Sequence, residues 1–204
     1  MNKLSTGRLA VILLTLFFSS LTLAEENNSS PQKGLVENLH TRLVEQMQSG
    51  ETYEERASRL ESLVASTFDT FTIARIALGS HWKNLEPEEQ VQMQARIKAL
   101  IISNYAGRFK KFTGESFSSL NEQPIGSNRY LVKTILLTGK NETVNLDYFL
   151  TESDGRWKIY DVTANGVSDL ALKRASYSDI FKRLGFAGVL DEIDNQVDKN
   201  KPAR

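Results

Sequence analysis

Residues 143–164, with the sequence TVNLDYFLTESDGRWKIYDVTA, decide the fold. Apolar side chains alternate with polar ones over residues 143–150, and apolar and aromatic residues return over residues 157–164. A period of two is typical of strands. Ser153-Asp154-Gly155 lies between the two runs and is a turn signal. The segment therefore predicts two antiparallel strands joined by a tight turn.

Two further strands precede this segment. Phe117 and Leu120 begin the first, and residues 130–137 form the second. Turn residues separate them at 124–128, and Gly139-Lys140-Asn141 separates the second strand from the third. Three successive tight connections predict a four-stranded antiparallel meander. Because apolar groups fall on both faces of this sheet, helices are expected to cover much of both.

Helical periodicity dominates the rest of the chain. Apolar residues recur at intervals of three and four over 31–49 and 53–68, in a short segment between Asp69 and Gly79, over 86–113, and after Gly166 and Gly185. The segment 86–113 begins with proline and acidic residues and is expected to be the longest helix and the main packing wall. The fold class is α+β, with about six to seven helices around the sheet. Residues 198–204 are polar and expected to be loose.

The first 24 residues have the pattern of a cleaved secretory signal. Lys3 and Arg8 form a basic start, residues 9–21 are an apolar run, and Thr22-Leu23-Ala24 offers small residues for cleavage. The run is shorter than the roughly 20 residues of a membrane-spanning helix. We therefore expect residues 1–24 to be a signal peptide, and residues 25–204 to form one domain, free in a bacterial periplasm.

Charge and composition exclude several classes of function. Removing Lys3 and Arg8 leaves 23 basic residues against 25 acidic ones, a balance that argues against a nucleic-acid binder. The sequence contains no cysteine, which excludes disulfides, thiolate metal sites and a thiol nucleophile. Stability must therefore come from packing.

Groups able to perform catalysis are scarce. His40 is expected on the polar side of the first helix and His81 in a loop beside Trp82, each with a structural or surface role. Asp147 and Asp161 lie inside predicted strands, where a carboxylate needs a partner. One of them acting as a base in a cup-shaped enzyme is an alternative hypothesis, and a hydrogen bond or an ion pair is the simpler one. An enzyme is not expected.

Motifs spread over residues 35–193 resemble one known family. They include Phe68-Asp69-x-x-x-Ile73-Ala74, Gly155-Arg156-Trp157-Lys158-Ile159-Tyr160-Asp161-Val162 and Gly166-Val167-Ser168. Together they resemble the MlaC family, the phospholipid carriers of the Mla lipid-transport system, also called the toluene-tolerance auxiliary component family. Asp169 stands where this family usually has an apolar residue, and Lys173 where it often has a tyrosine.

The resemblance implies a twisted sheet wrapped by helices, with an apolar pocket that takes the acyl chains of a phospholipid. It implies a periplasmic carrier that exchanges lipid between an outer-membrane lipoprotein complex and an inner-membrane ABC transporter with its hexameric substrate-binding ring. Such a carrier would maintain the lipid asymmetry of the outer membrane and approach membranes only transiently. It would need no cofactor besides its phospholipid cargo and no metal.

Candidate site residues follow from periodicity and from this hypothesis. The expected pocket walls are Ile73, Ile76, Ile97, Leu100, Ile101, Tyr105, Leu146, Tyr148, Tyr160, Val167 and Tyr177. Lys173 and Arg174 are the candidates for contact with the lipid phosphate. The third hypothesis, a periplasmic adaptor or chaperone, predicts a filled core with no continuous cavity.

Overall fold

The computed structural model describes residues 29–202, so the predicted signal peptide at residues 1–24 lies outside the described residues. Four α-helices precede the sheet, with a short 3-10 helix before the last of them. They are α1 Pro31–Gln48, α2 Tyr53–Thr67, α3 Thr70–Leu78, η1 Gly79–Asn84 and α4 Pro87–Arg108.

An antiparallel sheet and one C-terminal helix follow. Their bounds are β1 Ser116–Gly126, β2 Arg129–Leu137, β3 Thr143–Ser153, β4 Arg156–Ala164, β5 Val167–Ser168 and α5 Asp169–Lys199. Each strand pairs with its neighbours in the chain, so the order is β1-β2-β3-β4-β5. The predicted α+β meander is therefore present, and each of the four predicted strands corresponds to a strand of the sheet.

Three details of the prediction are wrong. The sheet has a fifth strand, because β5 pairs with the end of β4 across the Asn165-Gly166 turn. α4 ends at Arg108 rather than at residue 113, since Phe109 leaves the helical conformation. Five α-helical elements are present among the described residues instead of six or seven, because α5 takes in both of the last two predicted helices, one on each side of Gly185.

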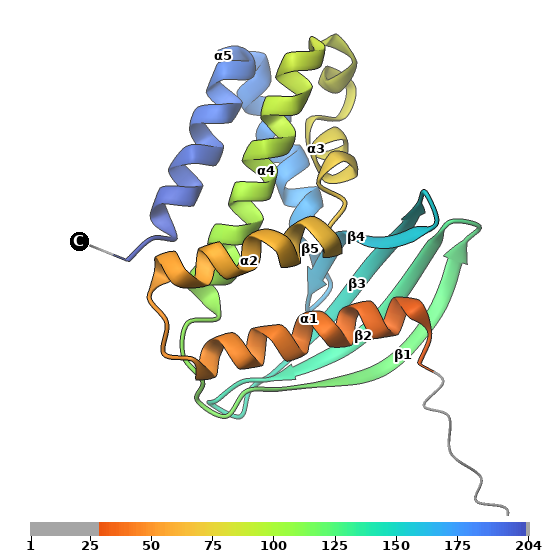
Figure 1. The fold of residues 1–204 in the computed structure, drawn as a ribbon. Helices are drawn as coiled ribbons and strands as arrows, with labels where there is room; N and C mark the ends of the chain where they lie inside the picture. Colours follow the sequence, from red (N-terminus) through yellow and green to blue (C-terminus); the bar gives the residue numbers. More distant parts are fainter. Residues whose placement is uncertain (1–28, 203–204) are drawn as a thin grey trace, which may run out of the picture.

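α5 nevertheless bends where the sequence predicts a break. Gly185 has φ 70° and ψ −167°, a backbone conformation that is nearly restricted to glycine. The two halves of α5 run side by side beyond this point (Figure 1). The predicted loose tail also begins later than expected, because α5 includes Asp198 and Lys199, and Asn200 donates to Asn104 at 2.7 Å.

The sheet presents one face to the helices. Leu146, Tyr148 and Leu150 alternate toward that face, whereas Lys133 lies opposite Asp147 on the other. The helices lie on one side of the sheet in Figure 1, so the expectation that they cover both faces is wrong. The register of β3 and β4 shifts between Phe149 and Leu150, and beside this irregularity the Phe149 and Tyr160 rings are 6.4 Å apart, with the Arg129 guanidinium over Tyr160.

Helix caps and one backbone bridge hold the helices on the sheet. Ser30, Thr52 and Asp69 each accept a hydrogen bond from a first-turn N–H, which fixes the starts of α1, α2 and α3. At the junction of α2 and α3 the Asp69 N–H donates to the Ile159 carbonyl of β4 at 2.8 Å. Phe68 and Ile159 are both buried there, so this junction joins the helices to the inner face of the sheet.

The conformation of Gly185 leads to a testable prediction. Gly185→Ala places a side chain at a positive φ and is expected to lower the free energy of unfolding by about 1–3 kcal/mol. Gly34→Ala is the matched control: Gly34 lies inside α1, where an added Cβ would meet no atom within 4 Å, so alanine should stabilise by about 0.5–1 kcal/mol. Urea unfolding measures both variants. Equal effects of the two substitutions would contradict the assignment of a glycine-specific bend.

Candidate functional site

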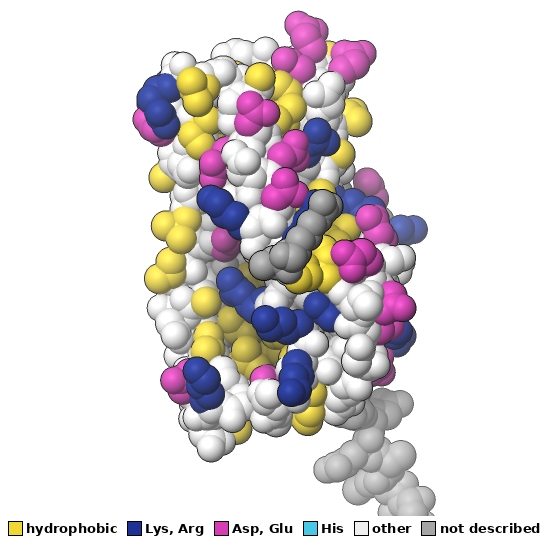
Figure 2. All heavy atoms as spheres, turned by 90° about the vertical axis from the view of Figure 1, so that its left-hand side faces the viewer, with side chains coloured by type: hydrophobic (Ala, Val, Ile, Leu, Met, Phe, Trp, Pro, Cys, Tyr) yellow, Lys and Arg dark blue, Asp and Glu magenta, His cyan; other side chains and the backbone are white. Residues whose placement is uncertain are grey.

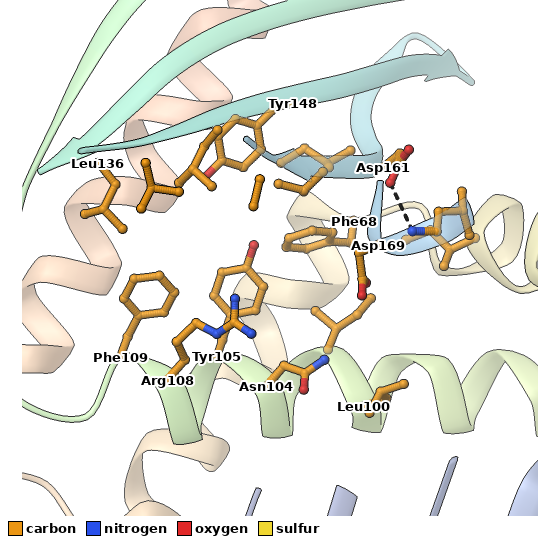
Figure 3. A pocket seen from close by; sticks show the side chains of 18 of the residues that line it. Phe68, Leu100, Asn104, Tyr105, Arg108, Phe109, Leu136, Tyr148, Asp161 and Asp169 are labelled. Atoms are coloured by element: carbon orange, nitrogen blue, oxygen red, sulfur yellow. Dashed lines mark hydrogen bonds between the residues drawn. The ribbon is translucent and has the colours of Figure 1, made fainter. Parts of the chain in front are cut away.

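A cavity of about 420 Å³ lies between the inner face of the sheet, α4 and the start of α5. Its volume falls in the range of about 300–1,000 Å³ that is usual for ligand pockets. Aliphatic and aromatic side chains supply most of its wall, and the cavity is open to solvent. Tyr148 and Leu136 reach in from the sheet, and Tyr105 and Phe109 from the facing helix end (Figure 3).

The structure places most of the predicted wall residues around this cavity. Ile97, Leu100, Ile101 and Tyr105 come from α4, and the remaining ones from other elements are Ile73, Leu146, Tyr148, Tyr160 and Val167. They come together because α4 and the strands present their apolar periodicities to the same space. That they bind a ligand stays a prediction.

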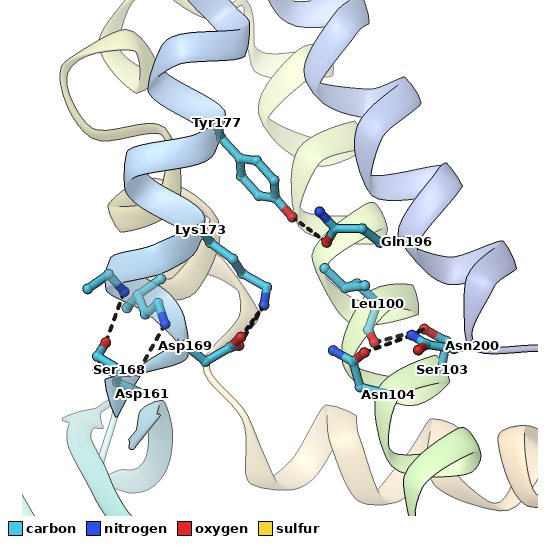
Figure 4. Close-up of polar contacts among 12 residues, drawn as sticks. Leu100, Ser103, Asn104, Asp161, Ser168, Asp169, Lys173, Tyr177, Gln196 and Asn200 are labelled. Carbon is cyan, nitrogen blue, oxygen red and sulfur yellow. Dashed lines mark hydrogen bonds and ion pairs between the residues drawn. The ribbon is translucent and has the colours of Figure 1, made fainter. Parts of the chain in front are cut away.

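Two predicted wall residues lie elsewhere. Tyr177 is fully buried, and its hydroxyl donates to Gln196 at 3.2 Å between the two halves of α5 (Figure 4). Ile76 is partly buried against the hydrophobic core. Both sit in apolar stripes, which identify buried positions but do not distinguish a cavity wall from a filled core.

Several wall residues were not singled out from the sequence. Phe109 continues the α4 stripe, and Val144 shares the strand face of Leu146, so the same periodicities could have identified both. The others include Met47, Phe68, Leu136, Ile159, Val162, Ala164 and Leu170. Asn104 and Arg108 also line the cavity, and no apolar pattern points to them.

Two tyrosine hydroxyls lie in this apolar surrounding. The Tyr148 hydroxyl bonds to His40 Nε2 at 2.9 Å. The Tyr105 hydroxyl extends into the space between α4 and the sheet and has no hydrogen-bond partner among residues 29–202 (Figure 3). Burial raises the pKa of both phenols above the ordinary value, so both remain protonated and able to donate.

His40 occupies a different environment from the one predicted. It lies inside the protein with 6 % of its surface exposed, and its ring stacks on Phe117 with 4.0 Å between centroids. The expected position on the polar side of the first helix is therefore wrong: the sheet curls around α1, so that β1 and β3 both contact His40. Burial lowers the pKa of His40 from 6.5 to about 4. His81 lies in η1, and its ring stacks on that of Phe181 in α5, with 4.3 Å between the ring centroids.

Charged groups lie at the cavity edge. Lys173, whose side chain is 13 % exposed, forms an ion pair with Asp169 at 2.6 Å, so this headgroup candidate is already partnered (Figure 4). Arg174 does not line the cavity, and its guanidinium lies against Gly79. Arg108 reaches the cavity from the end of α4 and has no carboxylate partner among residues 29–202.

The two aspartates proposed for catalysis have structural surroundings. Asp161 lines the cavity and accepts hydrogen bonds from Ser168 Oγ at 2.7 Å and from the Leu170 N–H at 3.3 Å, which orders the start of α5. Asp147 is on the outer face of the sheet, opposite Lys133. Within residues 29–202 no group of three or more acidic or histidine side chains could hold a metal ion. In that same range, no helix has the length and hydropathy to cross a membrane.

The buried imidazole generates a prediction about pH. Between pH 6.5 and about 4 the unfolded chain binds a proton at His40 that the folded protein does not, so stability falls as the pH falls through this window. A difference of one between the folded and unfolded pKa values corresponds to about 1.4 kcal/mol, so the loss between pH 7 and pH 4.5 should be roughly 2–3 kcal/mol.

His40→Gln is the matched variant, because an amide bonds to the Tyr148 hydroxyl without titrating. Its stability should fall by roughly 2–3 kcal/mol less than that of the wild type over the same pH range, as measured by urea unfolding. Parallel pH profiles for the two proteins would show that His40 does not titrate as the structure implies.

Comparison with known proteins agrees with this architecture. The phospholipid-binding protein from Ralstonia solanacearum, solved in complex with a phospholipid, superimposes with a TM-score of 0.69 and 22 % sequence identity. The alignment covers 84 % of this chain and 97 % of that one, and shows that the two share a fold. The family model described as MlaC protein matches residues 35–195. This chain therefore belongs to the MlaC family.

Proposed function

We propose that this protein is a soluble phospholipid carrier of the periplasm. The observation that carries the proposal is the open, mostly apolar cavity between α4 and the sheet. Membership of the MlaC family and the fold shared with a phospholipid-binding protein support it. The cargo would place its acyl chains against Ile97, Ile101 and Leu146 and keep its headgroup toward solvent.

Hydrophobic transfer energies explain why such a carrier is needed. Each methylene group exposed to water costs about 0.8 kcal/mol, so an acyl chain of about 15 carbons costs on the order of 12 kcal/mol. Free diffusion of a phospholipid through an aqueous compartment is therefore negligible. A binding protein that encloses the chains removes most of this cost and needs no reactive group.

The route of the cargo is also part of the proposal. The signal-peptide pattern of residues 1–24 and the family support exchange of lipid between an outer-membrane lipoprotein complex and an inner-membrane ABC transporter with its hexameric ring. The result would be maintenance of outer-membrane lipid asymmetry. The surroundings of Asp147 and Asp161 favour binding over catalysis, and the open cavity disfavours an adaptor with a filled core.

Lipid loading tests the carrier proposal directly. Protein purified from a lipid-containing host should carry phospholipid in native mass spectrometry, and emptied protein should take up phospholipid from vesicles. Val144→Trp fills the cavity from β3 and should reduce loading at least tenfold. Asn145→Trp is the control, because the neighbouring side chain is exposed and points to the other face. Equal loading of the two variants, or no loading of the wild type, would overturn the proposal.

The unpaired phenol of Tyr105 gives a second test. Tyr105→Phe removes a donor that no residue from 29 to 202 accepts and that can bond a ligand in the cavity, so phospholipid affinity should fall by roughly three- to tenfold. The empty protein should keep or slightly gain stability, because no hydrogen bond is lost in it. Vesicle-uptake titration and urea unfolding measure the two effects. Loss of stability without loss of affinity would show that the hydroxyl serves the fold instead of the ligand.

A further inference from the structure

A second cleft, of about 460 Å³, adjoins the apolar cavity and differs from it in character. It lies between the start of α2, the end of α4 and the last described residues of the chain. Five cationic side chains line it and no acidic side chain does: Arg56, Arg108, Lys110, Lys199 and Lys201. Basic and acidic residues are balanced over the whole sequence, 25 of each, so this concentration of positive charge is a local feature.

Most of these cations lack a carboxylate partner. Arg56 has 7 % of its surface exposed, yet its guanidinium donates only to the carbonyls of Ala106, at 3.0 Å, and Glu51. Arg108, Lys110 and Lys199 form no ion pair with any residue from 29 to 202, whereas Lys201 pairs with Asp198. A nearly buried guanidinium without a counter-charge raises the local potential and favours an anion in the cleft.

The cleft and the apolar cavity are neighbours that share two wall residues. Asn104 and Arg108 line both, and they lie side by side with Tyr105 at the C-terminal end of α4 (Figure 3). Figure 2 shows Lys and Arg side chains gathered around an apolar hollow on this side of the molecule. A ligand could therefore occupy both spaces without leaving the protein surface.

The order of these groups follows the chemistry of one kind of molecule. The cavity has apolar walls, and the Tyr105 hydroxyl and the Asn104 amide lie where it meets the cleft. The cations of the cleft lie beyond them. A phospholipid has the same order of acyl chains, ester carbonyls and phosphate. A zwitterionic headgroup carries an ammonium that the five cations would repel, whereas a headgroup whose only charges are negative would be attracted.

We infer that the basic cleft is a headgroup subsite that selects anionic phospholipids over zwitterionic ones. The inference rests on the proposed carrier function and adds the class of cargo. Lys110 and Lys199, which are exposed and unpaired, supply the selectivity together with Arg108 and Arg56. Neither of the sequence-based candidates contributes, because Lys173 is paired with Asp169 and Arg174 lies outside both spaces.

The experiment measures which lipid is loaded. Emptied protein is incubated with vesicles of equal parts phosphatidylcholine and phosphatidylglycerol with identical acyl chains, and native mass spectrometry gives the ratio of bound lipids. The wild type should prefer phosphatidylglycerol. Lys110→Gln/Lys199→Gln should reduce that preference about tenfold at moderate salt. Lys83→Gln/Lys182→Gln removes the same charge from exposed lysines on η1 and α5 that form no ion pair within residues 29–202, and should match the wild type.

Other outcomes overturn the inference in distinguishable ways. Equal loading of the two lipids by the wild type, or an unchanged ratio in the cleft variant, shows that the cleft does not read the headgroup. If the ratio of bound lipids in the cleft variant is unchanged but the variant no longer sediments with phosphatidylglycerol vesicles, the cations bind the membrane surface instead of the bound lipid. Binding of inorganic phosphate, seen by calorimetry and lost in the cleft variant while the lipid ratio is unchanged, assigns them to a free anion. No loading in any of the proteins overturns the carrier function itself.

Discussion

The distance at which α4 is held from the sheet is the constraint on which the rest of the structure depends. α4 packs mainly against α2, α3 and α5 instead of lying on the strands. These three helices each contact β4 and therefore act as spacers. Side chains of ordinary size on α4 and on β3 cannot fill the resulting gap, although both surfaces are apolar. The cavity is thus a product of helix packing and needs no unusual residue in its wall.

The spacers are fixed by polar contacts at their ends. The Asp69 N–H and the Ile159 carbonyl join the α2–α3 junction to β4, and the Asp161 carboxylate holds the first turn of α5 through Ser168 and Leu170. Backbone and cap hydrogen bonds have defined lengths and directions, unlike apolar contacts. They therefore position the helices without requiring that the space between them be filled.

Local patterns made much of the fold predictable. The alternation around Tyr148 predicted the strands, Asp69 and Ser30 predicted helix starts, and Gly185 predicted a break in the last helix. These features depend on neighbours within a few residues. The fifth strand is not predictable in this way, because a pairing of two residues leaves no periodicity in the sequence. The predicted end of α4 is too late, because the apolar stripe continues into Phe109 and Phe112 beyond the last helical turn.

The site could be predicted only in part for the same reason. Periodicity found most of the cavity wall, because α4 and β3 each present a regular apolar face. It misplaced His40, whose burial depends on how far β1 curls around α1. It gave no sign of the basic cleft, because Arg56, Arg108 and Lys199 are far apart in the sequence and meet only when the end of the chain returns to α4.

Under the proposed carrier function, the cavity beneath the sheet has an empty and a filled form, and these two forms differ in stability. A cargo that binds only the folded state stabilises it in proportion to the logarithm of its concentration over its dissociation constant. Empty molecules therefore open more often and are exposed to proteases more often than filled ones. In a compartment that contains proteases, empty protein would therefore be degraded faster than filled protein. The amount of protein that remains would then follow the supply of cargo.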